Sequence, residues 1–338
     1  MNITDAQLSG GCHVVILGAG ASIASDIRDP EVHGLKLPSM KNLPDAVGLH
    51  GALSHFSSEL IVEGNYEATY SNIAERHPNS LYLKEMNDLI YAYFSSMQLP
   101  MKPTIYDYLI MSLRDKDVIA TFNWDPFLYQ AWWRNYRHGS SPRLLFLHGN
   151  VAIGYNEEKD KIGWADSISK HTGNYYKPTQ LLFPVKHKNY NQDLFISRQW
   201  EMLQTRLTKE ECNTHNVTVF GYSAPVTDVE ALSMMKNAWG NIGDRNLEQF
   251  EFIDIRDEED VLKSWSGFVH THHYYYAKDF FKSSLALYPR RTEEAFWCHF
   301  LFTTPEEACV EPNPVPDNFE TFDEMWKWYQ PLIDKESR

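Results

Sequence analysis

The sequence predicts an α/β fold built on an open parallel sheet, and a set of short apolar runs carries this prediction. The runs His13 to Leu17, Val118 to Thr121 and Leu144 to Leu147 each end at a glycine or polar turn. The first is apolar on both faces, which is typical of a strand buried between helix layers. Similar runs are Val217 to Phe220 and Phe250 to Ile255. We therefore expect a Rossmann-like open parallel sheet with helices on both faces.

We expect the chain to divide into a main α/β domain at residues 1–260 and an extension at residues 261–338. Residues 46–113 show helical spacing and predict an inserted helical module. One helix face in this module is formed by Leu81, Met86, Leu89, Ile90, Tyr93 and Phe94. Residues 27–44 predict a loop over a bound ligand, and residues 151–190 predict a small lobe or flap. The extension is aromatic and acidic, which indicates a helical C-terminal region used for packing or oligomerisation.

Composition and charge exclude several classes of protein. The 338 residues include 31 basic and 45 acidic side chains, and the net charge of -14 disfavours a nucleic-acid-binding surface. The four cysteines form no C-x-x-C pair, so we expect reduced thiols and neither a zinc ribbon nor a disulfide framework. No apolar stretch reaches the ~18 residues of a membrane span, and we see no signal-peptide pattern. We expect a cytoplasmic protein that does not bind membranes.

A glycine-rich turn follows the first predicted strand. In Gly18-Ala19-Gly20-Ala21-Ser22, backbone N–H groups at the start of a helix suit a pyrophosphate, and the Ser22 hydroxyl adds a donor. The dehydrogenase pattern G-x-G-x-x-G requires glycine at position 23, where this chain has Ile23, so hydride transfer is disfavoured. The alternative is a tight turn that serves packing alone.

An amide and a carboxylate follow the second predicted strand. Asn123 and Asp125 flank Trp124, so in extended backbone their side chains point to the same side. The Asn123 amide suits a ribose hydroxyl or an attacking water, and the Asp125 carboxylate suits hydroxyls or a developing oxocarbenium charge. Asp125 alternatively caps a helix that begins near Pro126.

A histidine follows the third predicted strand. His148 precedes Gly149, and a neutral imidazole at this strand end can deprotonate a ribose hydroxyl or the incoming water. Taken alone, such a histidine is more often an ordinary turn residue. The presence of Asn123 and the glycine turn at neighbouring strand ends favours the catalytic interpretation. Together these segments predict a site that breaks NAD at the nicotinamide–ribose bond.

Two later strand ends extend the predicted site. Gly221 and Ser223 lie in a turn where the serine can bond a phosphate or ribose, and Asp254 or Asp257 can accept from the adenosine ribose. Solvated turn residues are the alternative. We expect no metal, because His270, His272 and His273 have no further partner at ligand spacing.

The order G-A-G-A-S, T-F-N-W-D, L-H-G and V-F-G-Y-S resembles the sirtuin superfamily, specifically its bacterial NAD-hydrolase branch in antiphage defence systems. The resemblance covers most of residues 13–257, although only the turns are close. It implies that Asn123 and His148 are the catalytic pair. It further implies dinucleotide-binding residues, namely Gly18, Ala19, Gly20, Ser22, Asp125, Gly221 and Ser223.

The chain departs from deacylating sirtuins in two respects. Those enzymes carry paired C-x-x-C zinc ligands after the catalytic histidine, whereas residues 151–211 contain no cysteine. Their usual glutamine before the catalytic asparagine is Phe122 here. The resemblance therefore implies water as the acceptor and no zinc module.

We expect an NAD glycohydrolase, with NAD as substrate, that depletes NAD as the effector of an antiphage defence system. We further expect a homo-oligomer and a defence-system partner protein that controls activity. One alternative is a non-catalytic sensor of NAD or ADP-ribose, and a further one is a protein deacylase or ADP-ribosyltransferase.

Overall fold

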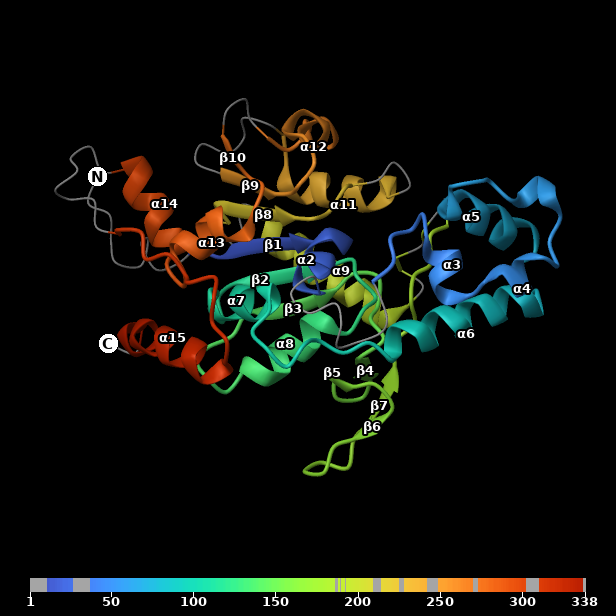
Figure 1. Ribbon diagram of the computed structural model, residues 1–338, viewed down its shortest axis with the longest axis horizontal. Helices are drawn as coiled ribbons and strands as arrows, with labels where there is room; N and C mark the ends of the chain where they lie inside the picture. Colours follow the sequence, from blue (N-terminus) through green and yellow to red (C-terminus); the bar gives the residue numbers. More distant parts are fainter. Residues whose placement is uncertain are drawn as a thin grey trace.

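A six-stranded parallel sheet forms the centre of the molecule (Figure 1). The computed structural model describes residues 11–26, 37–185, 188, 190–191, 193–208, 214–224, 228–241, 249–269, 273–301 and 310–336. The strands are β1 (His13–Leu17), β2 (Val118–Thr121), β3 (Arg143–Phe146), β8 (Asn216–Phe220), β9 (Gln249–Ile253) and β10 (Tyr274–Ala277). Their order is β10-β9-β8-β1-β2-β3, and every pair is parallel. The predicted open parallel sheet is confirmed.

Burial on both faces explains why the strands were recognisable. Every residue of β1, β2 and β8 is buried, as expected for strands between two helix layers. The prediction for β9 runs two residues too far, because the strand ends at Ile253 and Ile255 is 86% exposed. β10 was not predicted as a strand.

Helices cover both faces of this sheet (Figure 1). They are α2 (Ala19–Asp26), α7 (Ile105–Met111), α8 (Phe127–Asn135), α9 (Leu194–Leu207), α11 (Val229–Trp239) and α12 (Glu258–Trp265). α2, α7 and α8 pack against one another, whereas α9 packs against α11 and β3. α9 begins where the Asp193 carboxylate accepts from the Ile196 N–H at 2.9 Å, and it buries Trp200 and Leu203.

The helical module lies to one side of the sheet in Figure 1. Its elements are α3 (Leu43–Val47), α4 (His50–Leu53), η1 (Ser58–Leu60), α5 (Tyr66–Arg76) and α6 (Leu81–Ser95). The Ser80 hydroxyl caps α6, and the buried stripe is Leu83, Met86, Ile90 and Phe94. The predicted face is therefore wrong at Leu81 and Leu89, which are 80% and 36% exposed because they lie on the solvent side of the helix. α7 packs on α8 and is not part of this lobe.

The small lobe is an antiparallel sheet. Its strands are β4 (Ile153–Asn156), β5 (Lys161–Trp164), β6 (Ser167–Ile168) and β7 (Tyr175–Pro178), in the order β5-β4-β7-β6. The small lobe or flap expected at residues 151–190 thus contains four short strands. The β6–β7 hairpin projects from the body of the molecule (Figure 1).

The C-terminal region is helical and integral to the fold. It comprises η2 (Phe280–Lys282), α13 (Ser284–Leu287), α14 (Thr292–Leu301) and α15 (Phe322–Glu336). Arg290 is 2% exposed, and its guanidinium donates to the Met111 and Leu113 carbonyls at 3.0 Å and to Glu336 at 2.7 Å. Buried contacts of this kind tie the C-terminal helices to the end of α7.

Two further findings bear on the sequence expectations. Within the described residues, no helix combines the length and apolar character needed to span a bilayer. Cys12 is a buried free thiol, but Cys298 is disulfide-bonded, so the expectation of reduced cysteines is wrong there. Spacing along the chain does not encode which thiols meet in space.

Candidate functional site

The strand order places a ligand crevice between β1 and β8. The chain runs outward from β1 through β2 to β3, and then returns to the other side of β1 at β8. This order is typical of dinucleotide-binding sheets, in which ligands lie outside the carboxyl ends of the strands where the direction of winding reverses.

Two glycine turns meet at this point. The Gly18 N–H donates to the Phe220 carbonyl and the Gly20 N–H to the Gly221 carbonyl, each at 3.0 Å. A Cβ on Gly20 would lie 2.8 Å from the Gly221 Cα, and Gly221 has a φ of +61°. The close approach of the two turns therefore requires glycine at these positions.

A cavity of about 170 Å³ opens at the crevice. Seven predicted site residues line it, namely Gly18, Ala19, Asn123, Asp125, His148, Gly221 and Ser223. Leu37, Pro38 and Met40 also line it, so the described part of the predicted 27–44 loop borders the site; residues 27–36 lie outside the described residues. The helical module contributes Glu67 and Phe94.

The amide of Asn123 is held in one orientation. Asn123 is 9% exposed, and its Nδ2 donates to the Gly18 carbonyl and to Ser22 Oγ, both at 2.8 Å, with Tyr106 Oη at 3.3 Å. These contacts occupy the amide hydrogens. No group among the described residues bonds Oδ1, so the amide oxygen remains available as an acceptor.

Asp125 combines the two roles considered for it. Its carboxylate accepts from the Phe127 N–H at 3.1 Å and so caps the start of α8, yet the residue also lines the cavity. It is 3% exposed, and burial raises its pKa to about 6, against the lowering effect of bonds from the Ser22 hydroxyl and the Phe127 amide.

His148 is a buried, neutral imidazole. Burial, with a smaller contribution from Lys188, lowers its pKa well below the ordinary value of 6.5. Nε2 lies 3.1 Å from the Tyr190 hydroxyl, and no described residue bonds Nδ1. The Phe122 ring packs edge-on against the imidazole at 4.9 Å and stacks on Tyr222 at 4.2 Å. The catalytic-base role requires this neutral form.

Sequence reasoning missed a buried ion pair in the cavity wall. Lys188 bonds the Asp228 carboxylate, which also accepts from the Tyr222 hydroxyl at 3.0 Å. Burial lowers the pKa of Lys188 to about 8, although Glu67 and Glu230 raise it. No sequence pattern indicates this ion pair, because Lys188 and Asp228 are 40 positions apart and neither belongs to a turn motif.

Three predicted residues lie outside the cavity lining. Gly20 packs against Gly221, and Ser22 is fully buried behind Asn123, where its Oγ lies 2.6 Å from the Tyr106 hydroxyl. Asp254 pairs with Arg256, with an Nη2–Oδ2 distance of 2.5 Å. Roles of these residues in ligand binding remain predictions.

Metal ligation has no support in the part of the chain that the structure describes. No group of three or more His, Cys, Asp or Glu side chains is arranged there to hold an ion. His270 and His272 lie outside the described residues.

No protein-family model matches the chain, and no curated protein matches it. Among solved structures, it is similar to a Sir2 homologue mutant in complex with 2′-O-acetyl-ADP-ribose. The identity is 11%, the match covers 96% of this chain and 94% of that chain, and the TM-score is 0.42.

Two other solved structures are also similar. A Sir2 homologue–NAD complex is 12% identical, with coverage of 81% and 86% and a TM-score of 0.41. Sir2 with an inhibitor, 2′-O-acetyl-ADP-ribose and a deacetylated peptide is 14% identical, with coverage of 82% and 92% and a TM-score of 0.38. These identities are too low to assign the chain to a family.

Proposed function

We propose that this protein is an NAD glycohydrolase that cleaves NAD to nicotinamide and ADP-ribose. The observation that carries the proposal is that Asn123 and His148, which follow two different strands, line one cavity beside the glycine turn. The strand order supports a dinucleotide at this position. α2 begins at Ala19, which lines the cavity, so the positive end of the helix dipole is suited to the pyrophosphate.

In the proposed reaction, the bond between nicotinamide nitrogen and ribose C1′ breaks, and its electron pair leaves with nicotinamide. The sugar develops an oxocarbenium-like positive charge. The Asp125 carboxylate, which is ionised above about pH 6, supplies a fixed negative charge in the same buried cavity. Charge of this kind is effective where water is excluded.

Water completes the reaction by bonding to C1′. Asn123 Oδ1 accepts a hydrogen bond from the attacking water or a ribose hydroxyl, because its amide hydrogens already bond Gly18 and Ser22. Neutral His148 takes the proton that the water loses. General-base assistance is typically worth ~10²–10⁴ in rate.

The aromatic pair beside the histidine supports water as the acceptor. Phe122 stands where the resemblance to deacylases implies a glutamine, and its ring is stacked on Tyr222 and packed against His148. These rings offer no amide to orient an acyl group. The proposal therefore favours hydrolysis over deacylation.

The motif resemblance supports a biological role as an NAD-depleting effector of antiphage defence in the cytoplasm. We extend the proposal to a homo-oligomer whose activity a defence-system partner controls. An unrestrained NAD hydrolase would exhaust its own cell's cofactor.

The test is release of nicotinamide from NAD, measured by chromatography. We expect wild-type protein to release it when it is assayed together with the proteins encoded beside it, and His148→Ala to lose ~10²–10⁴ in kcat under the same conditions. His50→Ala is the matched control, because His50 is an exposed histidine outside the cavity. Full activity in His148→Ala would refute the assigned base.

The same assay separates the other functions. Saturable NAD binding without product, in both wild-type protein and Asn123→Ala, would identify a sensor. Turnover that requires an acylated protein or a protein acceptor would identify a deacylase or ADP-ribosyltransferase.

A further inference from the structure

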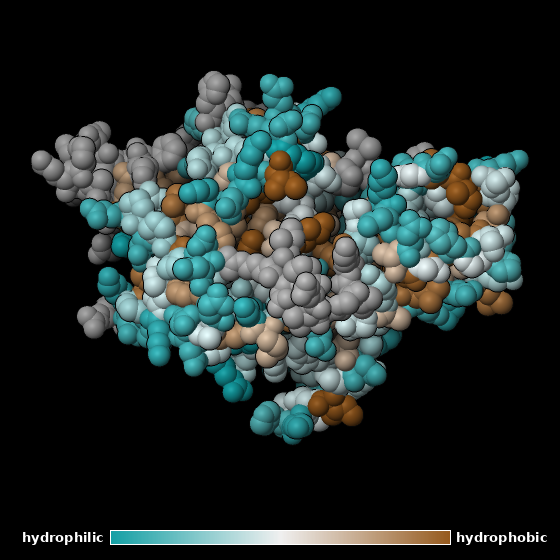
Figure 2. All heavy atoms as spheres, in the orientation of Figure 1, coloured by the Kyte–Doolittle hydropathy of each residue, from teal (hydrophilic) through white to brown (hydrophobic). Residues whose placement is uncertain are grey.

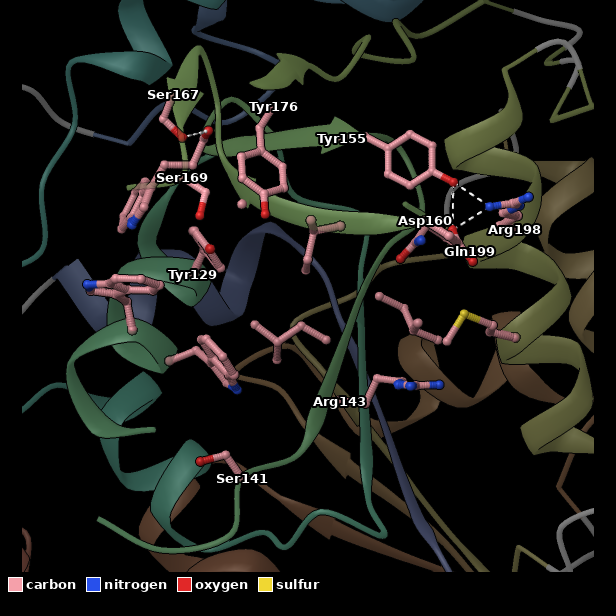
Figure 3. A pocket seen from close by; sticks show the side chains of 18 of the residues that line it. Tyr129, Ser141, Arg143, Tyr155, Asp160, Ser167, Ser169, Tyr176, Arg198 and Gln199 are labelled. Atoms are coloured by element: carbon pink, nitrogen blue, oxygen red, sulfur yellow. Dashed lines mark hydrogen bonds and ion pairs between the residues drawn. The ribbon is translucent and has the colours of Figure 1, made fainter. Parts of the chain in front are cut away.

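A second and larger concave site lies at the β3 edge of the main sheet. This groove has a volume of about 1180 Å³ and is bounded by α8, β3, α9 and the small lobe (Figure 3). None of the residues that line it lines the cavity of the proposed hydrolase site. A function of the groove is therefore separate from NAD binding.

The groove is rich in aromatic and exposed apolar side chains. Tyr129 packs on Trp164 at 4.6 Å, and Trp133 lies beside the same ring at 5.8 Å. Trp133 is 45% exposed, and Ile162, at another part of the lining, is 41% exposed. Exposed apolar side chains gathered in one groove are typical of an interaction site.

One wall of the groove is the β6–β7 hairpin, residues 167–177, which we call the basic hairpin. It carries Lys170, His171 and Lys177 and no acidic residue, in a chain whose net charge is -14. It also exposes Ile168 by 67% and Tyr175 by 46%. Figure 2 shows apolar surface on this projecting part of the molecule, where its own body does not cover it.

The remainder of the groove has the opposite charge. Asp115 and Glu201 are exposed and form no ion pair with any described residue. Asp160 pairs with Arg198, so these two neutralise each other. The hairpin contributes its own Lys170 and His171 to the lining. Outside the hairpin, Arg143 opposes the two unpaired carboxylates, which leaves an excess of one negative charge in the remainder of the groove. The groove and the basic hairpin are therefore complementary in charge as well as in apolar character.

We propose that the groove receives the basic hairpin of a second copy of this chain. Because hairpin and groove lie on the same chain, a twofold axis lets two copies exchange hairpins and form the contact twice. The partner's apolar hairpin surface packs on the aromatic wall, and its lysine faces the free carboxylates. The chain's own hairpin forms a wall of its groove and projects outward (Figure 1), and it leaves Ile168 and Tyr175 exposed for a second copy.

Sedimentation velocity over a wide range of protein concentrations tests the proposal. We expect a dimer for the wild type, and an increase of at least about tenfold in its Kd for Ile168→Ser, because the lost apolar contact occurs twice per dimer. Leu81→Ser is the matched control, since Leu81 is 80% exposed in the helical module. Unchanged thermal melting establishes that each variant folds.

A charge exchange tests the assigned orientation. Lys170→Glu alone and the pair Asp115→Lys with Glu201→Lys should each weaken the dimer, and the three substitutions together should restore it. A monomeric wild type, equal weakening by Leu81→Ser, or no recovery in the triple variant would overturn the proposal. Nicotinamide release does not enter this test, so failure here leaves the proposed hydrolase activity untouched.

Discussion

Replacing Asp125 by asparagine should stabilise the protein while it impairs the site. Burial raises the pKa of this carboxyl from 3.8 to about 6, so the folded protein holds an unfavourable charge above that pH. At ~1.36 kcal/mol for each pKa unit, this rise means that the ionised carboxylate destabilises the folded protein by about 3 kcal/mol. Asparagine retains an oxygen that can accept from the Phe127 N–H, whose present bond length is 3.1 Å, and it carries no charge.

The sign of the effect follows from the raised pKa. Protonation of Asp125 favours the folded state, so the wild type is relatively most stable below pH 3.8 and loses this advantage as the pH rises through about 6. The free energy of unfolding of Asp125→Asn should therefore exceed that of the wild type by about 3 kcal/mol at about pH 7.5. About half of that difference should remain near pH 5.

Urea denaturation at both pH values measures the difference, and nicotinamide release measures the functional loss. Stabilisation together with lower kcat is the expected combination, since functional sites often retain unfavourable charges. A less stable Asp125→Asn variant, or a gain that does not change with pH, would show that burial does not penalise this carboxylate.

Three further predictions concern the same site. Wild-type kcat should fall as the pH drops through about 6, because protonation of Asp125 removes its negative charge. A pH profile of kcat from a stopped assay that shows no such fall would exclude Asp125 as the stabilising charge. Ser22→Ala should lower kcat about tenfold with little change in KM, because Asn123 loses a partner at 2.8 Å; Ser25→Ala, which removes only a bond within α2, is the control and should stay near wild type. Gly221→Ala should cost more than about 2 kcal/mol of stability in chemical denaturation, because its Cβ would lie 2.4 Å from the Ala21 nitrogen. Gly64→Ala isolates the cost of positive φ alone, since nothing lies within 4 Å of its Cβ, and equal losses in both variants would contradict the packing argument.

The sheet could be predicted because its strands are buried on both faces. β1 and β2 have the predicted bounds, since a short apolar run bounded by turn residues is typical of a fully buried strand. β10 (Tyr274–Ala277) could not be recognised, because three consecutive tyrosines lack both alternation and an aliphatic run. β5, β6 and β7 of the small lobe were missed for a similar reason, since two to four partly exposed residues leave no period to detect.

The site could be predicted only where its residues belong to turns. Asn123 and His148 line one cavity because parallel strands deliver their carboxyl ends to the same edge. Ser22 illustrates the limit, since its place in the turn was evident but its burial behind Asn123 depends on Tyr106. Tyr106 lies on α7, whose capping box marks the start of a helix but not its position behind the site. Asp254 directly follows β9, yet Arg256 two positions later donates to its carboxylate.

α9 touches both the groove and the backbone that carries His148. Gln199 Oε1 accepts from the Phe146 N–H at 3.3 Å, and Trp200 Nε1 donates to the Leu147 carbonyl at 3.1 Å, while Glu201 on the same helix faces the groove. α9 therefore connects the groove physically to the backbone that precedes His148. By thermodynamic linkage, any effect of dimerisation on NAD binding is mutual. If dimerisation increases the affinity for NAD by some factor, NAD binding must increase the affinity between the two copies by the same factor.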